Sequence, residues 1–103
     1  MSLFSYVILY VEDIEKIISF YEKAFDLELR FICEEKVYAE LKTENTTLAF
    51  ATHAQARSNL PYDYDKITLS KPPQSFEIAF TTTDMEKTLN NVSCEFISLK
   101  IND

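Results

Sequence analysis

The sequence has 103 residues, of which 47% are hydrophobic and 26% are charged. This composition fits one globular domain and excludes a disordered chain. Ten basic residues against seventeen acidic residues give a formal charge of −7, which makes nucleic acid and anionic membranes poor candidates as partners. Glycine is absent, and with it the glycine-rich loops that bind phosphates in nucleotide-binding proteins.

Apolar stretches and cysteines indicate the compartment. No apolar run approaches the roughly 20 residues that a membrane span needs, and no basic region precedes Val7–Val11 as it would in a secretory signal. Cys33 and Cys94 are too few and too distant to predict a disulfide framework. We therefore expect a cytoplasmic protein with reduced thiols that binds neither membranes nor nucleic acid.

The first element is a strand that passes into a helix. Phe4–Val11 is rich in β-branched and aromatic residues, which is typical of a buried strand. Asp13 is a good N-cap, and apolar residues follow it at helical spacing as far as Phe25. Asp26 should then take the left-handed position after the helix, because aspartate and asparagine tolerate positive φ better than other non-glycine residues.

Three further strands are predicted after this helix, at Leu27–Cys33, Val37–Leu41 and Thr46–Thr52. The order of elements up to His53 is therefore β-α-β-β-β. Polar residues and prolines then predict a long connection over residues 54–75, with one helical turn near Ala54–Asn59. Such long connections usually link two units or cover a site.

The pattern of the first half returns in the second. We expect a strand at Phe76–Thr81, a helix opened by a capping box of Thr83 and Glu86, and a strand at Cys94–Ile101.

A repeat joins the two halves, because Asp13–Lys16 (DIEK) aligns with Asp84–Lys87 (DMEK) and the same spacing pairs Tyr6 with Glu77. The sequence therefore predicts one domain over residues 1–103, with a first module at 4–53, a connecting loop at 54–75 and a partial second module at 76–103.

Three stretches of the sequence resemble a known family. They read VILYVEDIEKIISFYEKAFDLELRF, YAELKTENTTLAFATH and FEIAFTTTDMEKT, and they cover most of Tyr6–Thr88. They resemble the glyoxalase/bleomycin-resistance/extradiol-dioxygenase superfamily, also called vicinal oxygen chelate proteins. The resemblance implies an α+β fold of paired βαβββ modules whose curled sheets enclose a small-molecule site, with the second module incomplete at its C-terminal end.

The resemblance also implies where a metal would be bound. In metal-dependent members the ligands lie near the start of the first strand and on the last strand of each module, positions that fall on Tyr6, Ala49 and Glu77. The fourth position would lie on a strand that this sequence lacks. A catalytic metal usually keeps three ligands from His, Glu, Asp or Cys, so we expect no metal and no cofactor.

Strand alternation predicts the lining of the site. It turns Tyr6 and Tyr10 toward the concave side, together with Ala49 and Glu77. Glu77 is a general base if the cavity is closed and a solvated acid if it is open. His53 is either a solvated residue at a strand end or a rim residue that changes charge near neutral pH. Two phenols and a carboxylate suit a flat or cationic organic ligand.

Three functions stay open, and no catalytic residue is assigned. The leading one is metal-free small-molecule binding in an aromatic cleft. The others are a metal-dependent lyase or dioxygenase whose ligands a partner chain completes, and a degenerate protein without a ligand. Because residues 76–103 have no room for two final strands, we expect an open sheet edge and a homodimer, unless the sequence is a shortened product.

Overall fold

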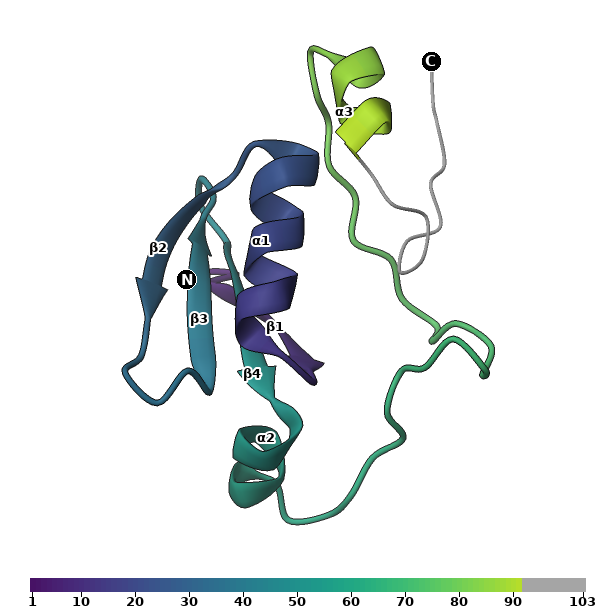
Figure 1. Cartoon of the computed structure of the whole chain (residues 1–103). Helices are drawn as coiled ribbons and strands as arrows, with labels where there is room; N and C mark the ends of the chain where they lie inside the picture. Colours follow the sequence, from purple (N-terminus) through teal and green to yellow (C-terminus); the bar gives the residue numbers. More distant parts are fainter. Residues whose placement is uncertain (92–103) are drawn as a thin grey trace.

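One mixed sheet carries a helix on one of its faces (Figure 1). The computed structural model describes residues 1–91 of the chain. Its elements are β1 (Tyr6–Val11), α1 (Ile14–Phe25), β2 (Glu28–Ile32), β3 (Tyr38–Lys42), β4 (Thr47–Thr52), α2 (His53–Asn59) and α3 (Met85–Asn91). The strand order is β1-β4-β3-β2, with β1 parallel to β4 and the other pairs antiparallel. This confirms the predicted α+β class and the βαβββ order of the first module.

Helix α1 is bounded by two aspartates, as the sequence predicted. The Asp13 side chain accepts a hydrogen bond from the Lys16 amide at 3.1 Å. Asp26 ends the helix at φ 55° and ψ 40°, a left-handed conformation that costs a non-glycine residue about 1 kcal/mol. Lys36, in the turn after β2, also has a positive φ of 57°. Positive φ in this chain is therefore not confined to aspartate and asparagine, the residues that tolerate it best.

The core lies between α1 and the sheet. It is built from buried side chains of α1, β3 and β4, namely Ile14, Ile18, Tyr21, Ala39, Leu41, Leu48 and Phe50. From β1, Val7, Leu9 and Val11 pack against this cluster. The alternation predicted for β1 is thus confirmed, and Tyr6, Ile8 and Tyr10 are left on the opposite face of the sheet.

The start of α3 repeats the start of α1. The Asp84 side chain accepts from the Lys87 amide at 2.9 Å, and its carbonyl accepts from the Thr88 amide at 3.2 Å, as Asp13 does for the corresponding residues of α1. The helix is therefore capped by Asp84, and the predicted capping box of Thr83 and Glu86 is wrong. The shared geometry supports the alignment of the two helix starts.

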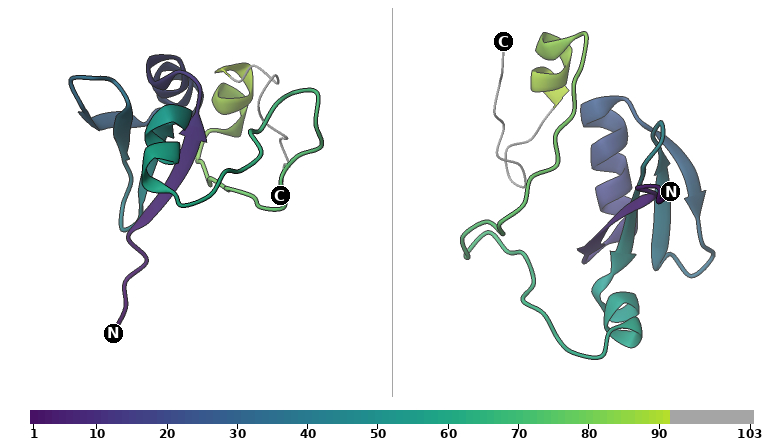
Figure 2. Two further views of the ribbon diagram at one scale, coloured as in Figure 1. Left: turned by 90° about the horizontal axis from the view of Figure 1, so that it is seen from below. Right: turned by 180° about the vertical axis from the view of Figure 1, so that it is seen from behind.

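The segment before α3 differs from its predicted structure. Residues Phe76–Thr81 form no strand and follow an irregular path beside α1 (Figures 1 and 2). Phe80 stacks on Phe25 at a centroid distance of 4.5 Å and lies 6.1 Å from Tyr21. A strand needs a hydrogen-bonding neighbour, whereas this apolar side chain is partly buried by packing against the core beside α1.

Two sequence predictions, the strand at Cys94–Ile101 and the thiol of Cys94, lie outside the described residues. Within residues 1–91, no helix is long and apolar enough to cross a membrane.

Candidate functional site

Large apolar side chains gather on the sheet face opposite α1. Tyr6, Ile8 and Tyr10 of β1, together with Phe31 of β2, are between 36% and 50% exposed. We call this surface the open face. Exposed large apolar side chains that share one face of a domain make that face a candidate binding surface.

The middle of the open face is made of small residues of β4. Ala49 lies between Ile8 of β1 and Glu40 of β3 in the strand register, and Ala51 lies between Tyr10 and Tyr38. Ala49 is fully buried, so its neighbours cover it. A ligand on this face would therefore meet the flanking side chains, with Ala49 as the floor beneath them.

A polar cluster that the sequence did not predict occupies one side of the open face. The Tyr38 hydroxyl donates to Glu40 Oε2 at 2.7 Å, and Glu40 Oε1 lies 3.8 Å from Arg30 Nε. Arg30 Nη1 in turn donates to Thr47 Oγ1 at 3.2 Å. Burial and, next, the carboxylate of Glu40 raise the pKa of Tyr38 far above its ordinary value. Tyr38 is therefore a permanent donor that holds Glu40 in place.

The alternation of buried and exposed residues within β3 is the sequence pattern that could have revealed this cluster. Ala39 and Leu41 are fully buried on the side of α1, which turns Tyr38, Glu40 and Lys42 toward the open face.

His53 lies at the rim of the open face. Its side chain is only 11% exposed, which favours the rim interpretation over that of a solvated residue. Nδ1 lies 2.6 Å from the Tyr64 hydroxyl, and Nε2 lies 3.6 Å from Glu12. Burial and then the charge of Lys66 lower the pKa of His53, so the ring is neutral near pH 7. The Tyr64 hydroxyl can therefore donate to Nδ1.

Tyr64 connects this rim to the open face. Its ring lies 5.1 Å from the ring of Tyr10, and the guanidinium carbon of Arg57 lies over the Tyr64 ring, 5.1 Å from the ring centroid. Arg57 is also paired with Asp63 at 2.8 Å. The start of the long connection is thus fixed beside the end of β1.

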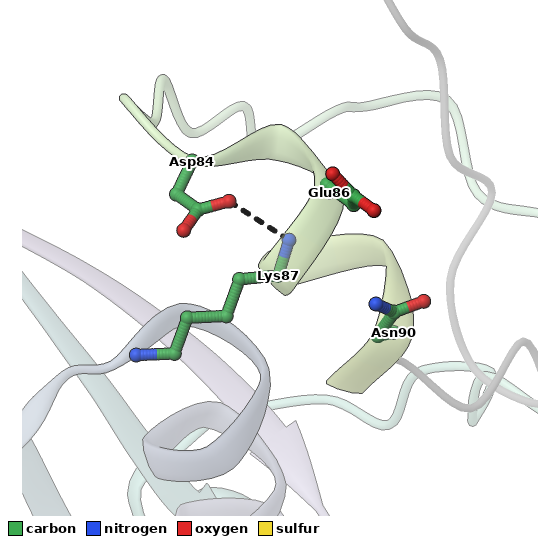
Figure 3. Close-up of a pocket in the computed structure, with 4 residues that line it drawn as sticks. All are labelled: Asp84, Glu86, Lys87 and Asn90. Carbon is green, nitrogen blue, oxygen red and sulfur yellow. Dashed lines mark hydrogen bonds between the residues drawn. The ribbon is translucent and has the colours of Figure 1, made fainter.

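Two hollows lie outside the open face. One, of about 260 Å³, adjoins His53 and is lined by Glu12, Thr52, His53, Ala54, Arg57 and Lys66. Its charges pair with one another, since Lys66 lies 3.4 Å from Glu12. The other lies on α3 and is lined by Asp84, Glu86, Lys87 and Asn90 (Figure 3). All four of its residues are exposed and polar, and none belongs to the open face.

The structure brings together only part of the site predicted from the sequence. Tyr6, Tyr10 and Ala49 share the open face, and His53 lies at its rim. Glu77 is exposed on an irregular segment, and Phe80, three residues later, packs on the helix side of the sheet. The repeat had predicted that a strand would carry Glu77 toward Tyr6, and the described residues include no such strand.

Comparison with known proteins decides the family. The family model of the Glyoxalase/Bleomycin resistance protein/Dioxygenase superfamily matches residues 3–93. The chain belongs to this superfamily. The resemblance seen in the sequence is thereby confirmed. No curated protein sequence matches the chain significantly.

Two solved structures of the superfamily are similar to this chain. One, a glyoxalase/bleomycin resistance protein/dioxygenase from Nocardioides, has a TM-score of 0.51 and 16% identity, over 66% of this chain and 47% of that chain. The other, a family enzyme from Burkholderia phytofirmans, has a TM-score of 0.45 and 19% identity, over 63% of this chain and 56% of that chain. The likeness to the Nocardioides protein supports the fold alone. The chain spans about half the length of these two structures.

The metal site implied by the superfamily does not fit the residues of the open face. Ala49 stands at one of the implied ligand positions, and a methyl group has no electron pair to donate. The carboxylate beside it in the register belongs to Glu40, which is engaged by Tyr38 and Arg30. Among residues 1–91, no three His, Cys, Asp or Glu side chains are grouped to hold a metal ion.

Proposed function

We propose that this superfamily member binds a flat small organic molecule on the open face without a metal. The observation that carries the proposal is the grouping of Tyr6, Ile8, Tyr10 and Phe31 as half-exposed side chains on the sheet face opposite α1. Aromatic rings bind flat ligands by burying apolar area, and ring pairing adds about 0.5–1.5 kcal/mol to that burial.

Metal-dependent lyase or dioxygenase chemistry is the less favoured alternative. It would need donor atoms at the positions of Tyr6 and Ala49. A neutral phenol is a poor ligand for a divalent metal, and alanine offers no ligand at all. The polar atoms that the open face does offer are hydrogen-bonded to one another around Glu40. Such a set orients a ligand but does not hold a metal ion.

The proposal predicts that truncating the aromatic side chains of the open face weakens ligand binding. In calorimetric titrations with the best binder from a panel of flat aromatic compounds, Tyr6→Ala and Tyr10→Ala should each lower the affinity roughly 5- to 30-fold. Tyr62→Ala serves as the control, because Tyr62 is exposed in the long connection and lies outside the open face. Equal affinities for all three variants and the parent protein would refute the proposal.

We further propose that a second copy of the chain pairs with the first along β1, at the margin of the open face. β1 is an edge strand with a neighbour on one side only among the described residues, and an unpaired edge favours association. The similar Nocardioides chain is about twice as long as the part that this chain covers. Two copies would supply a comparable amount of structure around one ligand.

The dimer should be visible by sedimentation velocity. At micromolar concentration we expect a species of twice the chain mass of 12.0 kDa, with a larger share of dimer when ligand is present, because ligand bound between two copies stabilises their association. A species of 12.0 kDa that persists at high protein concentration and with saturating ligand would rule out pairing along β1.

A further inference from the structure

We propose that Arg30 is the anion-binding residue of the open face, and that the ligand is therefore a flat aromatic molecule carrying a carboxylate. This inference rests on the proposed function, since it assigns the chemical class of the molecule bound there. It is carried by the contacts that orient Arg30 and by the aromatic residues beside it, one of which, Phe31, is brought to the same face by an irregularity in β2.

An irregularity in β2 places an aromatic ring, Phe31, next to Arg30 on the open face. Leu29 pairs with Leu41, but the register then shifts, so that Phe31 is opposite Glu40. Leu41 is buried on the helix side of the sheet, whereas Glu40 belongs to the open face. Arg30 and Phe31 therefore both reach the open face, although strict alternation would separate them. Bulges of this kind redirect side chains and are common next to binding sites.

The contacts of Arg30 hold the guanidinium without using all of its donors. Nη1 donates to Thr47 and Nε faces Glu40, whose other oxygen accepts from Tyr38. A guanidinium has five N–H donors in a fixed planar arrangement. Because the Arg30 side chain is 52% exposed, its other donors face solvent. Their fork geometry matches a carboxylate, which accepts two parallel hydrogen bonds.

The charge arrangement favours an anion over a cation. The carboxylate of Glu40 is only 15% exposed and is turned toward Arg30 and Tyr38, so the accessible charge of the cluster is the positive one. The cationic ligand that the sequence suggested would approach an exposed guanidinium. Two aromatic side chains can contact the ligand beside Arg30. One is Phe31, the next residue in the chain. The other is Tyr6, which pairs in the strand register with Thr47, the acceptor of the Arg30 hydrogen bond.

Two probes of equal shape test the inference, namely 2-naphthoate and the neutral 2-naphthamide. Calorimetry with the full chain should show at least tenfold tighter binding of 2-naphthoate. Arg30→Gln should abolish this preference while leaving the affinity for 2-naphthamide within about twofold. Arg30→Lys should keep only part of the preference, because a lysine cannot form the bidentate pair.

The control and the contradicting results separate this inference from the proposed function. Lys16→Gln removes the same charge from an exposed position on α1 and should leave the preference unchanged. If the parent protein binds both probes equally, or if Arg30→Gln keeps the preference, the role of Arg30 is refuted while binding on the open face stands. If neither probe binds at millimolar concentration, both the inference and the proposed function for flat aromatic ligands fail.

Discussion

Replacing Phe50 with alanine should lower the free energy of unfolding by about 3–5 kcal/mol. Phe50 is fully buried in the core, and its ring lies 5.2 Å from that of Tyr21 on α1. The substitution leaves a cavity at the contact between helix and sheet, which neighbouring side chains fill only in part. Urea denaturation followed by circular dichroism measures the change. If the alanine variant does not fold, Phe50→Leu should give a smaller decrease in the free energy of unfolding that can still be measured.

The matched control for Phe50 lies on the other face of the same sheet. Tyr6→Ala removes a ring of similar size from β1, but Tyr6 is half exposed on the open face. We expect Tyr6→Ala to lower the free energy of unfolding by no more than about 1 kcal/mol, because exposed side chains contribute little to stability. Equal losses for the two variants would contradict the assignment of one face to the core and the other to binding.

Replacing Glu40 with alanine should lower the free energy of unfolding by about 1–3 kcal/mol, because it leaves the partly buried Tyr38 hydroxyl without its acceptor. The same change should lower the pKa of Tyr38 toward its ordinary value, since the carboxylate is one cause of the increase. Burial is the larger cause and remains in the variant, so the pKa of Tyr38 should return only part of the way to its ordinary value. Ultraviolet titration of the phenol, compared with a Tyr38→Phe variant, measures this shift.

Glu28→Ala is the control for Glu40. Glu28 pairs with Lys42 at 3.4 Å across the same two strands, but both side chains are largely exposed. Exposed ion pairs contribute little, so the stability should change by less than about 0.5 kcal/mol. A loss as large as that of the Glu40 variant, or an unchanged Tyr38 titration, would argue against Glu40 as the organiser of the polar cluster.

Local signals predicted the first module well. The N-cap at Asp13 and the left-handed stop at Asp26 depend on neighbours within one turn of helix, and both were confirmed. The two faces of β1 were also predicted, because alternation needs no knowledge of the partner strand. These features placed Tyr6 and Tyr10 correctly on the surface opposite the helix.

Features that depend on distant partners were not predicted. The position of Phe31 beside Arg30 follows from a register shift against β3, which no residue of β2 signals by itself. The strand expected at Phe76–Thr81 had the right composition, but a strand forms only beside a hydrogen-bonding neighbour, and Phe80 packs on α1 instead. Glu77 was assigned to the site on the strength of that strand, and its place was wrong for the same reason.

The most direct test of the open face as the ligand site is a backbone amide NMR titration of the whole chain with 2-naphthoate. We expect saturable chemical-shift changes at β1 and β2, centred on Tyr6, Tyr10 and Phe31, with the solvent side of α1 unaffected. Changes confined to the hollow on α3 around Lys87, or an unchanged spectrum at millimolar 2-naphthoate, would contradict this expectation.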